Sequence, residues 1–274
     1  TKEESTKILE QVRTQVKEMR RHLIQNRYLY GKAEVVFEVE LDDIEEQISA
    51  FEDLTNEGNY SDAENLVMEA NERLAILNEK INALPVLYHS CKTYLPEQLD
   101  RLATGLIEMK ESGHRIHHFG FEKEIHKYHE QLLLMLELLE QGEINGVEDT
   151  VHEIESRIQE IYDKLEEEAL AKSFTEKQMP LMFRNLEEIE KDLQKTKEEV
   201  KILKESYHFD EEDEETQLSL DNFLKQLKVN GDKIKMELEE DKKNYTYLRI
   251  ELEEWMEEWQ KMYDTHQIFK QRIN

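Results

Sequence analysis

Five histidines lie close together in the sequence and have side chains that could bind a metal: His114, His117, His118, His126 and His129. The last two are three residues apart and would share one face of a helix, as zinc ligands can. No cysteine or carboxylate completes a recognisable ligand set around them, and the cluster spans a predicted turn between helices. We therefore predict surface and turn histidines, with no metal site and no cofactor.

The other reactive side chains predict no catalytic site. Cys91 is the single cysteine, which fits a reducing, cytosolic setting. It continues an apolar helical seam, which favours a buried small residue over a nucleophile. No Ser-His-Asp arrangement is recognisable, and no glycines cluster into a phosphate-binding loop. We predict that the protein is not an enzyme.

The charge balance excludes two classes of partner. The chain has 64 Asp and Glu against 36 Lys and Arg, a net charge of −28, which would repel nucleic acids and anionic lipid surfaces. The longest apolar stretch, 132–139, is far short of the about 20 residues that cross a bilayer, and we interpret it as core. Because the chain begins at Thr1 without an initiator Met, we expect it to be an internal segment of a longer protein.

Only 8 glycines and 3 prolines punctuate the 274 residues, too few for a sandwich, a barrel or a doubly wound sheet. Apolar residues instead recur at alternating spacings of three and four, which predicts helices packed along coiled-coil seams. Two clear runs are Leu74, Leu77, Ile81, Leu84, Tyr88, Cys91, Leu95 and Tyr245, Leu248, Leu252, Trp255, Trp259, Met262, His266, Phe269, Ile273. We predict helices at about 3–27, 33–56, 61–113, 119–141, 145–207, 213–240 and 245–273.

An internal repeat of 84 residues indicates the architecture. Shifting the chain by this period aligns Phe37 with Phe121, Leu54 with Leu138, Gly58 with Gly142, Ile81 with Leu165 and Pro96 with Pro180. Such a period suits helical hairpins stacked along a rod. We predict an all-α, elongated rod of tandem spectrin-like three-helix bundles sharing long helices, with repeats at 1–95, 96–180 and 181–274. We expect a monomer, because the seams within the chain already bury the apolar stripes.

The turns carry more specific predictions. Gly58 and Gly142 should end helices, and capping boxes should follow them at Ser61 with Glu64 and at Asn145 with Glu148. Pro96 and Pro180 should mark joints between bundles. The third repeat could close at 240–244 or at Asn230-Gly231. We favour the first, because one apolar seam continues through Gly231, although glycine within a helix costs about 1 kcal/mol.

Several short motifs resemble one known family. They are Asn26-Arg27 followed by Gly31 and Ala33-Glu34, then Gly58-Asn59-Tyr60-Ser61-Asp62-Ala63-Glu64, Leu84-Pro85, Leu95-Pro96-Glu97-Gln98-Leu99 and Gly113-His114. In this order and spacing, over the whole chain, they resemble an internal portion of the septation ring formation regulator EzrA family of Gram-positive bacteria.

The resemblance implies a cytoplasmic rod of spectrin-like repeats, anchored to the membrane by an N-terminal helix outside this chain. It implies a cell-division regulator that restrains assembly of the tubulin-like protein FtsZ and is a scaffold for other division proteins at the septum. The alternative is a generic cytoskeletal or coiled-coil spacer or scaffold unrelated to division.

An acidic rod would repel an acidic partner, so contact with FtsZ would require local basic residues. The candidate protein-binding residues are Arg20, Arg21, Arg27, Lys123 and Lys127. Exposed ion pairs contribute about 0–1 kcal/mol each. We therefore expect weak binding that falls as the salt concentration rises.

Overall fold

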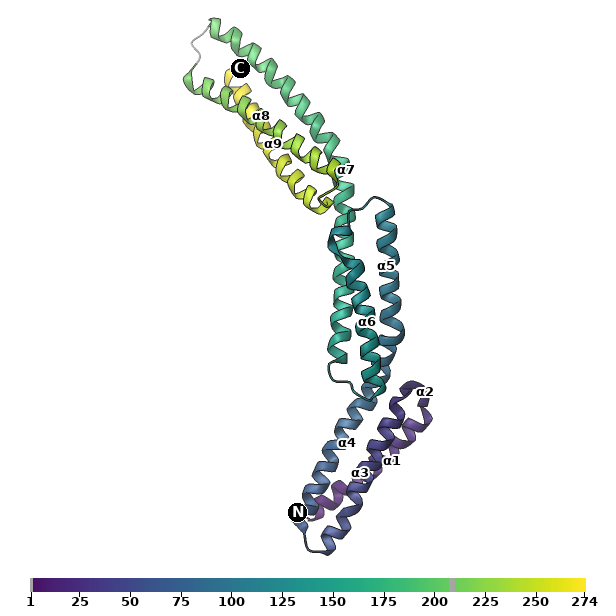
Figure 1. Cartoon of the computed structure of the whole chain (residues 1–274). Helices are drawn as coiled ribbons and strands as arrows, with labels where there is room; N and C mark the ends of the chain where they lie inside the picture. The colour runs from purple at the N-terminus through teal and green to yellow at the C-terminus, as the bar shows by residue number, and fades with distance from the viewer. Residues whose placement is uncertain (1, 207–209) are drawn as a thin grey trace. The chain divides into compact units, whose positions relative to one another are not determined.

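The computed structural model describes residues 2–206 and 210–274, and every regular element in these ranges is helical (Figure 1). The elements are α1 (Lys2–Gln25), α2 (Arg27–Tyr30), α3 (Ala33–Asn56), α4 (Tyr60–His89), the π-helical turn η1 (Ser90–Tyr94), α5 (Leu95–Glu111), the 3-10 turn η2 (His117–Phe119), α6 (Phe121–Glu140), α7 (Val147–Ser206), α8 (Glu211–Glu240) and α9 (Tyr245–Ile273). The predicted all-α fold is confirmed. Among residues 2–206 and 210–274, none of the helices combines the length and the hydrophobicity of a membrane span.

Most predicted helix bounds agree with the structure to within two residues. The predictions for α3 and α9 match at both ends. The first predicted helix ends early, at Gln25, and a separate short helix, α2, follows it. The last residue predicted for the helix at 145–207 lies outside the described residues.

The chain divides into two compact units. Unit 1 contains Thr1–Thr104 and Glu122–Glu160, and unit 2 contains Gly105–Phe121 and Ile161–Asn274. The long helix α7 therefore contributes its first turns to unit 1 and the rest of its length to unit 2.

In unit 1, α1, α3 and α4 lie side by side around an apolar core (Figure 1). Each helix contributes one buried stripe, which includes Leu9, Val12, Val16, Leu23, Phe37, Leu41, Ile44, Val67, Leu74 and Ile81. Spacings of three and four keep these side chains on one face of each helix. The buried Tyr30 of α2 adds a polar tie, because its hydroxyl donates to the Ile81 carbonyl of α4 at 2.9 Å.

Unit 1 also contains most of α6 with the adjoining parts of α5 and α7. In the apolar stretch 132–139, Leu132 and Leu139 are buried, as predicted. Leu133 and Leu134 are instead 64% and 57% exposed, so the prediction that the whole stretch is core is wrong. With 3.6 residues per turn, consecutive side chains point in different directions, so the apolar residues of this stretch, which Glu137 interrupts, cannot all face one core.

Two helix ends in unit 1 repeat the same turn 84 residues apart. After α3, Gly58 has a φ of +82°, and the Asn59 amide donates to the Leu54 carbonyl at 2.9 Å. After α6, Gly142 has a φ of +78°, and Glu143 donates to Leu138 at 2.9 Å. Glycine adopts this left-handed backbone without strain, so it ends both helices as predicted.

The predicted capping boxes after these turns are wrong. The residue preceding α4 is Asn59, so Ser61 already lies inside the helix. Asn145 lies two positions before α7, and the carbonyl that accepts the first helical hydrogen bond there, from Thr150, belongs to Gly146. The spacing of the capping-box residues did not predict where α4 and α7 begin, because the conformation of the backbone after each glycine determines the first residue of the next helix.

The π-helical turn η1 lies just before Pro96, the residue predicted to mark a joint. The Leu95 amide donates to the Ser90 carbonyl, five residues back, and helical structure continues into α5. Proline has no amide hydrogen and its ring crowds the carbonyl four residues before it, so a wider turn accommodates it. Pro180, its counterpart in the repeat, lies within the α-helix α7.

In unit 2, α7, α8 and α9 enclose a second apolar core, which includes Leu193, Leu227, Ile234, Leu252, Trp255 and Met262. α8 continues through Gly231 to Glu240, and α9 begins at Tyr245, so the favoured closing turn is confirmed. The indole of Trp255 lies directly against Gly231, and its Nε1 donates to the Leu227 carbonyl at 2.9 Å. Glycine at this position of α8 leaves room for the ring.

Two buried charged residues hold the α8–α9 turn within unit 2. The carboxylate of Glu168 on α7 is fully buried and accepts from the backbone amides of Tyr245 (2.6 Å) and Thr246 (3.0 Å). Arg115 donates to the carbonyls of Leu238 and Lys243. A carboxylate at a helix N-terminus and a guanidinium on terminal carbonyls both satisfy backbone groups that a helix leaves unpaired.

The seam residue His266 is also fully buried, between α9 and α7. Its Nε2 lies 2.9 Å from the hydroxyl of Thr196, which donates to the Asp192 carbonyl. Burial lowers the pKa of the imidazole below its usual value. The Asp192 carboxylate, 3.5 Å from Nδ1, opposes this shift, and Lys270, which is paired with that carboxylate, favours it.

We expect unit 2 to lose stability in mild acid because of His266. The unfolded imidazole binds a proton at higher pH than the folded one, so its contribution is complete above about pH 6.5 and declines as the pH falls through the lowered folded pKa. Urea unfolding can be followed by tryptophan fluorescence, because the two tryptophans, Trp255 and Trp259, are both on α9. Between about pH 7.5 and about pH 5.5, the native protein should lose more stability than His266→Gln. Equal losses would contradict this assignment.

Candidate protein-binding groove

The predicted binding surface near the end of α1 includes Arg20, Arg21 and Arg27. Two of these arginines form ion pairs with residues that the structure describes, and one does not. Arg20 donates to Asp42 of α3 at 2.8 Å. Arg27 was predicted to end the first helix, but it is instead the first residue of α2. Its Nε lies 2.8 Å from the carboxylate of Glu34. Arg21 is exposed and forms no ion pair with any described residue. Arg21 is therefore the arginine of this set that stays available to a partner.

Lys123 and Lys127 are exposed on α6, one helical turn apart. Neither forms an ion pair within the described ranges. Both belong to unit 1, as Arg20, Arg21 and Arg27 do, but no described contact joins the lysines to the arginines.

The histidines of the sequence cluster have different neighbours. His126 contacts Glu130 (3.1 Å), whereas His129 contacts Asp100 of α5 (3.2 Å). The described part of the chain contains no group of three or more His, Cys, Asp or Glu placed to hold a metal ion. Cys91 is buried, and burial raises the pKa of its thiol to about 11. The thiol is therefore protonated at neutral pH, as suits a core residue.

A groove of about 300 Å³ lies between α3 and α4 in unit 1, and we call it the α3–α4 groove. Its floor includes the buried Phe37 and Leu77, and the α6–α7 turn at 141–143 closes one end. Gly142 makes this closure possible, because an added Cβ would lie 3.0 Å from the Phe37 ring. Three of the lining side chains are apolar and exposed: Val36 (40%), Val39 (52%) and Ile76 (56%).

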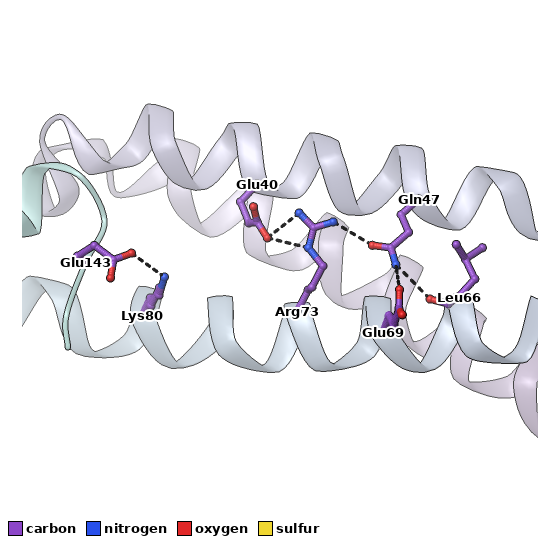
Figure 2. Close-up of polar contacts among 7 residues, drawn as sticks. All are labelled: Glu40, Gln47, Leu66, Glu69, Arg73, Lys80 and Glu143. Carbon is purple, nitrogen blue, oxygen red and sulfur yellow. Dashed lines mark hydrogen bonds and ion pairs between the residues drawn. The ribbon is translucent and has the colours of Figure 1, made fainter. Parts of the chain in front are cut away.

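Polar contacts fix the charged side chains of this groove (Figure 2). The Arg73 guanidinium of α4 holds Glu40 of α3 through Nε (3.0 Å) and Nη2 (2.9 Å), and its Nη1 donates to Gln47 at 2.9 Å. Lys80 reaches Glu143 of the α6–α7 turn at 3.3 Å. Both cations that line the groove are therefore already neutralised by carboxylates of the same unit, and their side chains are held in place.

Comparing the two copies of the 84-residue repeat shows which residues of the groove recur and which are found only in the first copy. The pair of Glu40 and Arg73 recurs 84 residues later as Glu124 and Arg157, which lie 2.6 Å apart. The apolar residues do not recur: Lys123 stands at the position of Val39, and Glu160 at that of Ile76. An apolar surface at these positions is thus a property of the first copy and not a requirement of the helix packing.

The sequence alone did not single out these groove residues. Val36, Val39 and Ile76 lie off the buried seams, where scattered apolar residues are normal in proteins. The available signal was the replacement of Val39 and Ile76 by charged residues one repeat later, Lys123 and Glu160. The replacement indicates a surface feature only when the packing of α3 on α4 is known, because that packing places the two valines and Ile76 in one groove.

Comparisons with known proteins agree with the resemblance described above. A family model for the septation ring formation regulator EzrA matches residues 1–274. The chain is 36% identical over 234 residues to the septation ring formation regulator EzrA of Oceanobacillus iheyensis, which covers 85% of this chain and 42% of that protein. The protein of the same name in Geobacillus kaustophilus is 31% identical over 83% of this chain and 40% of its own length.

In Bacillus subtilis, the regulator of that name is 32% identical over 73% of this chain and 36% of its own length. The chain thus spans less than half the length of these relatives. No solved structure matches it significantly. The family name supports a role in division over a spacer unrelated to division, and it names a regulator and not a reaction. The chain belongs to the septation ring formation regulator EzrA family.

Proposed function

We propose that the protein restrains assembly of the FtsZ ring and is a binding scaffold for division proteins at the septum, on the cytoplasmic face of the membrane. The observation that carries this proposal is the family match over the whole chain. The chemistry of the described residues fits binding: the single thiol is buried and protonated, and the charged side chains of the α3–α4 groove are paired. We also propose that residues 1–95, 96–180 and 181–274 are three spectrin-like repeats, that the protein is monomeric and that it is not an enzyme.

The contact with FtsZ would use the exposed cations of α1 and α6. Arg20 is less suited than the sequence suggested, because Asp42 already neutralises its charge. Arg21, Lys123 and Lys127 are exposed and unpaired among the described residues, so they are free to meet carboxylates of an acidic partner. Exposed ion pairs are individually weak and are screened by salt.

Co-sedimentation with purified FtsZ filaments tests this proposal. We expect weak binding at low salt that falls as salt is added, and fewer or shorter filaments when the protein is present. Arg21→Glu should weaken binding by up to about fivefold, since one exposed pair contributes about 1 kcal/mol or less.

A matched control is Lys7→Glu, which places the same acidic residue at another exposed position of α1 and should leave binding unchanged. Like Arg21, Lys7 forms no ion pair with a described residue. If Arg21→Glu also had no effect, the arginine surface would be wrong while the FtsZ proposal stood. If FtsZ assembled and sedimented identically with and without the protein, the FtsZ proposal itself would be contradicted.

A further inference from the structure

We propose that the α3–α4 groove binds a basic helical segment of a partner protein, anchored in the groove by apolar side chains. This site is distinct from the cations of α1 and α6 and does not depend on the FtsZ contact. The proposal rests on the exposed apolar lining of the groove, on the unpaired acidic residues around it and on the replacement of Val39, Asp43, Glu72 and Ile76 in the second copy of the repeat.

The shape and lining of the groove suit an apolar anchor. Val36 and Val39 of α3 face the groove with Ile76 of α4, and the buried Phe37 and Leu77 form its floor. Grooves between two helices commonly accept an amphipathic helix, whose apolar residues at i, i+3, i+4 and i+7 fill the space between them. The volume of about 300 Å³ lies at the lower end of the range of ligand-binding clefts, as suits a site that takes a few side chains.

The charge around the groove indicates the sign of the partner. α3 contains nine Asp and Glu and no Lys or Arg. On the helix surfaces, Asp43 neighbours Val39, and Glu72 and Glu79 flank Ile76 at positions i−4 and i+3. None of these three carboxylates forms an ion pair with a described residue. Because Arg73 and Lys80 are already paired with Glu40 and Glu143, the unpaired charge at the rim is negative, and it complements lysines or arginines.

In the second copy of the repeat most of these positions differ, although Glu79 corresponds to another acidic residue, Asp163. Asp43 corresponds to Lys127 and Glu72 to Ser156, in addition to the replacement of Val39 by Lys123 and of Ile76 by Glu160. The ion pair that joins the two helices is nevertheless kept there, as Glu124 with Arg157. The chain therefore provides its own substitutions for a test: residues that a related helix pair tolerates in the second copy can be placed at the matching positions of the first.

Fluorescence anisotropy with three labelled model peptides tests the proposal. Each peptide has about 15 residues. The first carries leucine at i, i+3, i+4 and i+7 among lysines, the second has serine in place of leucine, and the third has glutamate in place of lysine. We expect micromolar binding of the first peptide only. The double variant Val39→Lys with Ile76→Glu should weaken this binding at least about tenfold, because it removes two central anchors.

A control variant makes the same two kinds of substitution on exposed apolar residues elsewhere, Val86→Lys with Ile202→Glu, and should bind as the native protein does. Circular dichroism should show both variants folded. Equal binding by native protein and groove variant would overturn the proposal. So would equal binding of the serine peptide, which would show charge attraction alone, or of the acidic peptide. Sedimentation showing dimers that the groove variant abolishes would instead assign the groove to a second copy of the chain.

Discussion

Replacing Glu168 with alanine is expected to lower the free energy of unfolding of unit 2 by about 3 kcal/mol. The buried carboxylate accepts the amides of Tyr245 and Thr246 at the start of α9, and the Thr246 hydroxyl as well (2.7 Å). Without it, buried backbone donors have no acceptor, and each unsatisfied group costs about 1–3 kcal/mol. Urea unfolding followed by tryptophan fluorescence measures the change, because both tryptophans lie on α9.

Glu167→Ala is the matched control for this prediction. Glu167 precedes Glu168 in the same helix but is exposed, so its removal should change stability by less than about 0.5 kcal/mol. Glu168→Gln should fall between the two, since an amide offers one acceptor oxygen in place of two. If Glu168→Ala were as stable as Glu167→Ala, the carboxylate would not be the anchor of the α8–α9 turn.

Alanine substitution of two helical glycines is expected to change stability in opposite directions. Gly105→Ala in α5 should stabilise by about 0.5–1 kcal/mol, because alanine is the better helix former and its Cβ meets no atom within 4 Å. Gly231→Ala in α8 should destabilise by about 2 kcal/mol, because its Cβ would lie 2.5 Å from the Trp255 ring. Thermal unfolding followed by circular dichroism measures both changes.

A double-mutant cycle assigns the second effect to the indole. Phenylalanine at position 255 lacks the two ring atoms nearest to the added methyl group. In a Trp255→Phe background, Gly231→Ala should therefore lose most of its cost and approach the behaviour of Gly105→Ala. A cost that stayed the same in that background would show that the backbone of α8, and not the tryptophan, excludes a side chain here.

Glu168→Ala and Gly231→Ala both change the packing of unit 2, whereas the α3–α4 groove lies in unit 1. The peptide-binding test therefore has a further control within the chain. Glu168→Ala and Gly231→Ala should leave binding of the lysine–leucine peptide unchanged at temperatures where unit 1 stays folded. A parallel loss of stability and binding in these variants would indicate that the peptide reports folding and not occupation of the groove.

The all-α fold was predictable from the amino-acid pattern because helix formation depends on local spacing. Apolar residues at intervals of three and four determined the helices, and glycines with a left-handed backbone determined two of the turns, Gly58 and Gly142. The continuation of one seam through Gly231 placed the last turn correctly at 240–244. Family membership was equally accessible, since it depends on the order of short motifs along the chain.

Only the tertiary structure decided what the charged and off-seam residues do. Glu168 continues the seam from Leu165, which is the local signal that separates it from exposed Glu166 and Glu167. The groups that its carboxylate accepts from are decided only when α9 brings its amides to that position. The sequence offers Arg20 as a candidate protein-binding cation, and the structure pairs it with Asp42, 22 positions away. The α3–α4 groove likewise exists only where two helices meet. Helix periodicity is a local property of the chain, whereas ion pairs, buried acceptors and grooves depend on which distant residues the packing brings together.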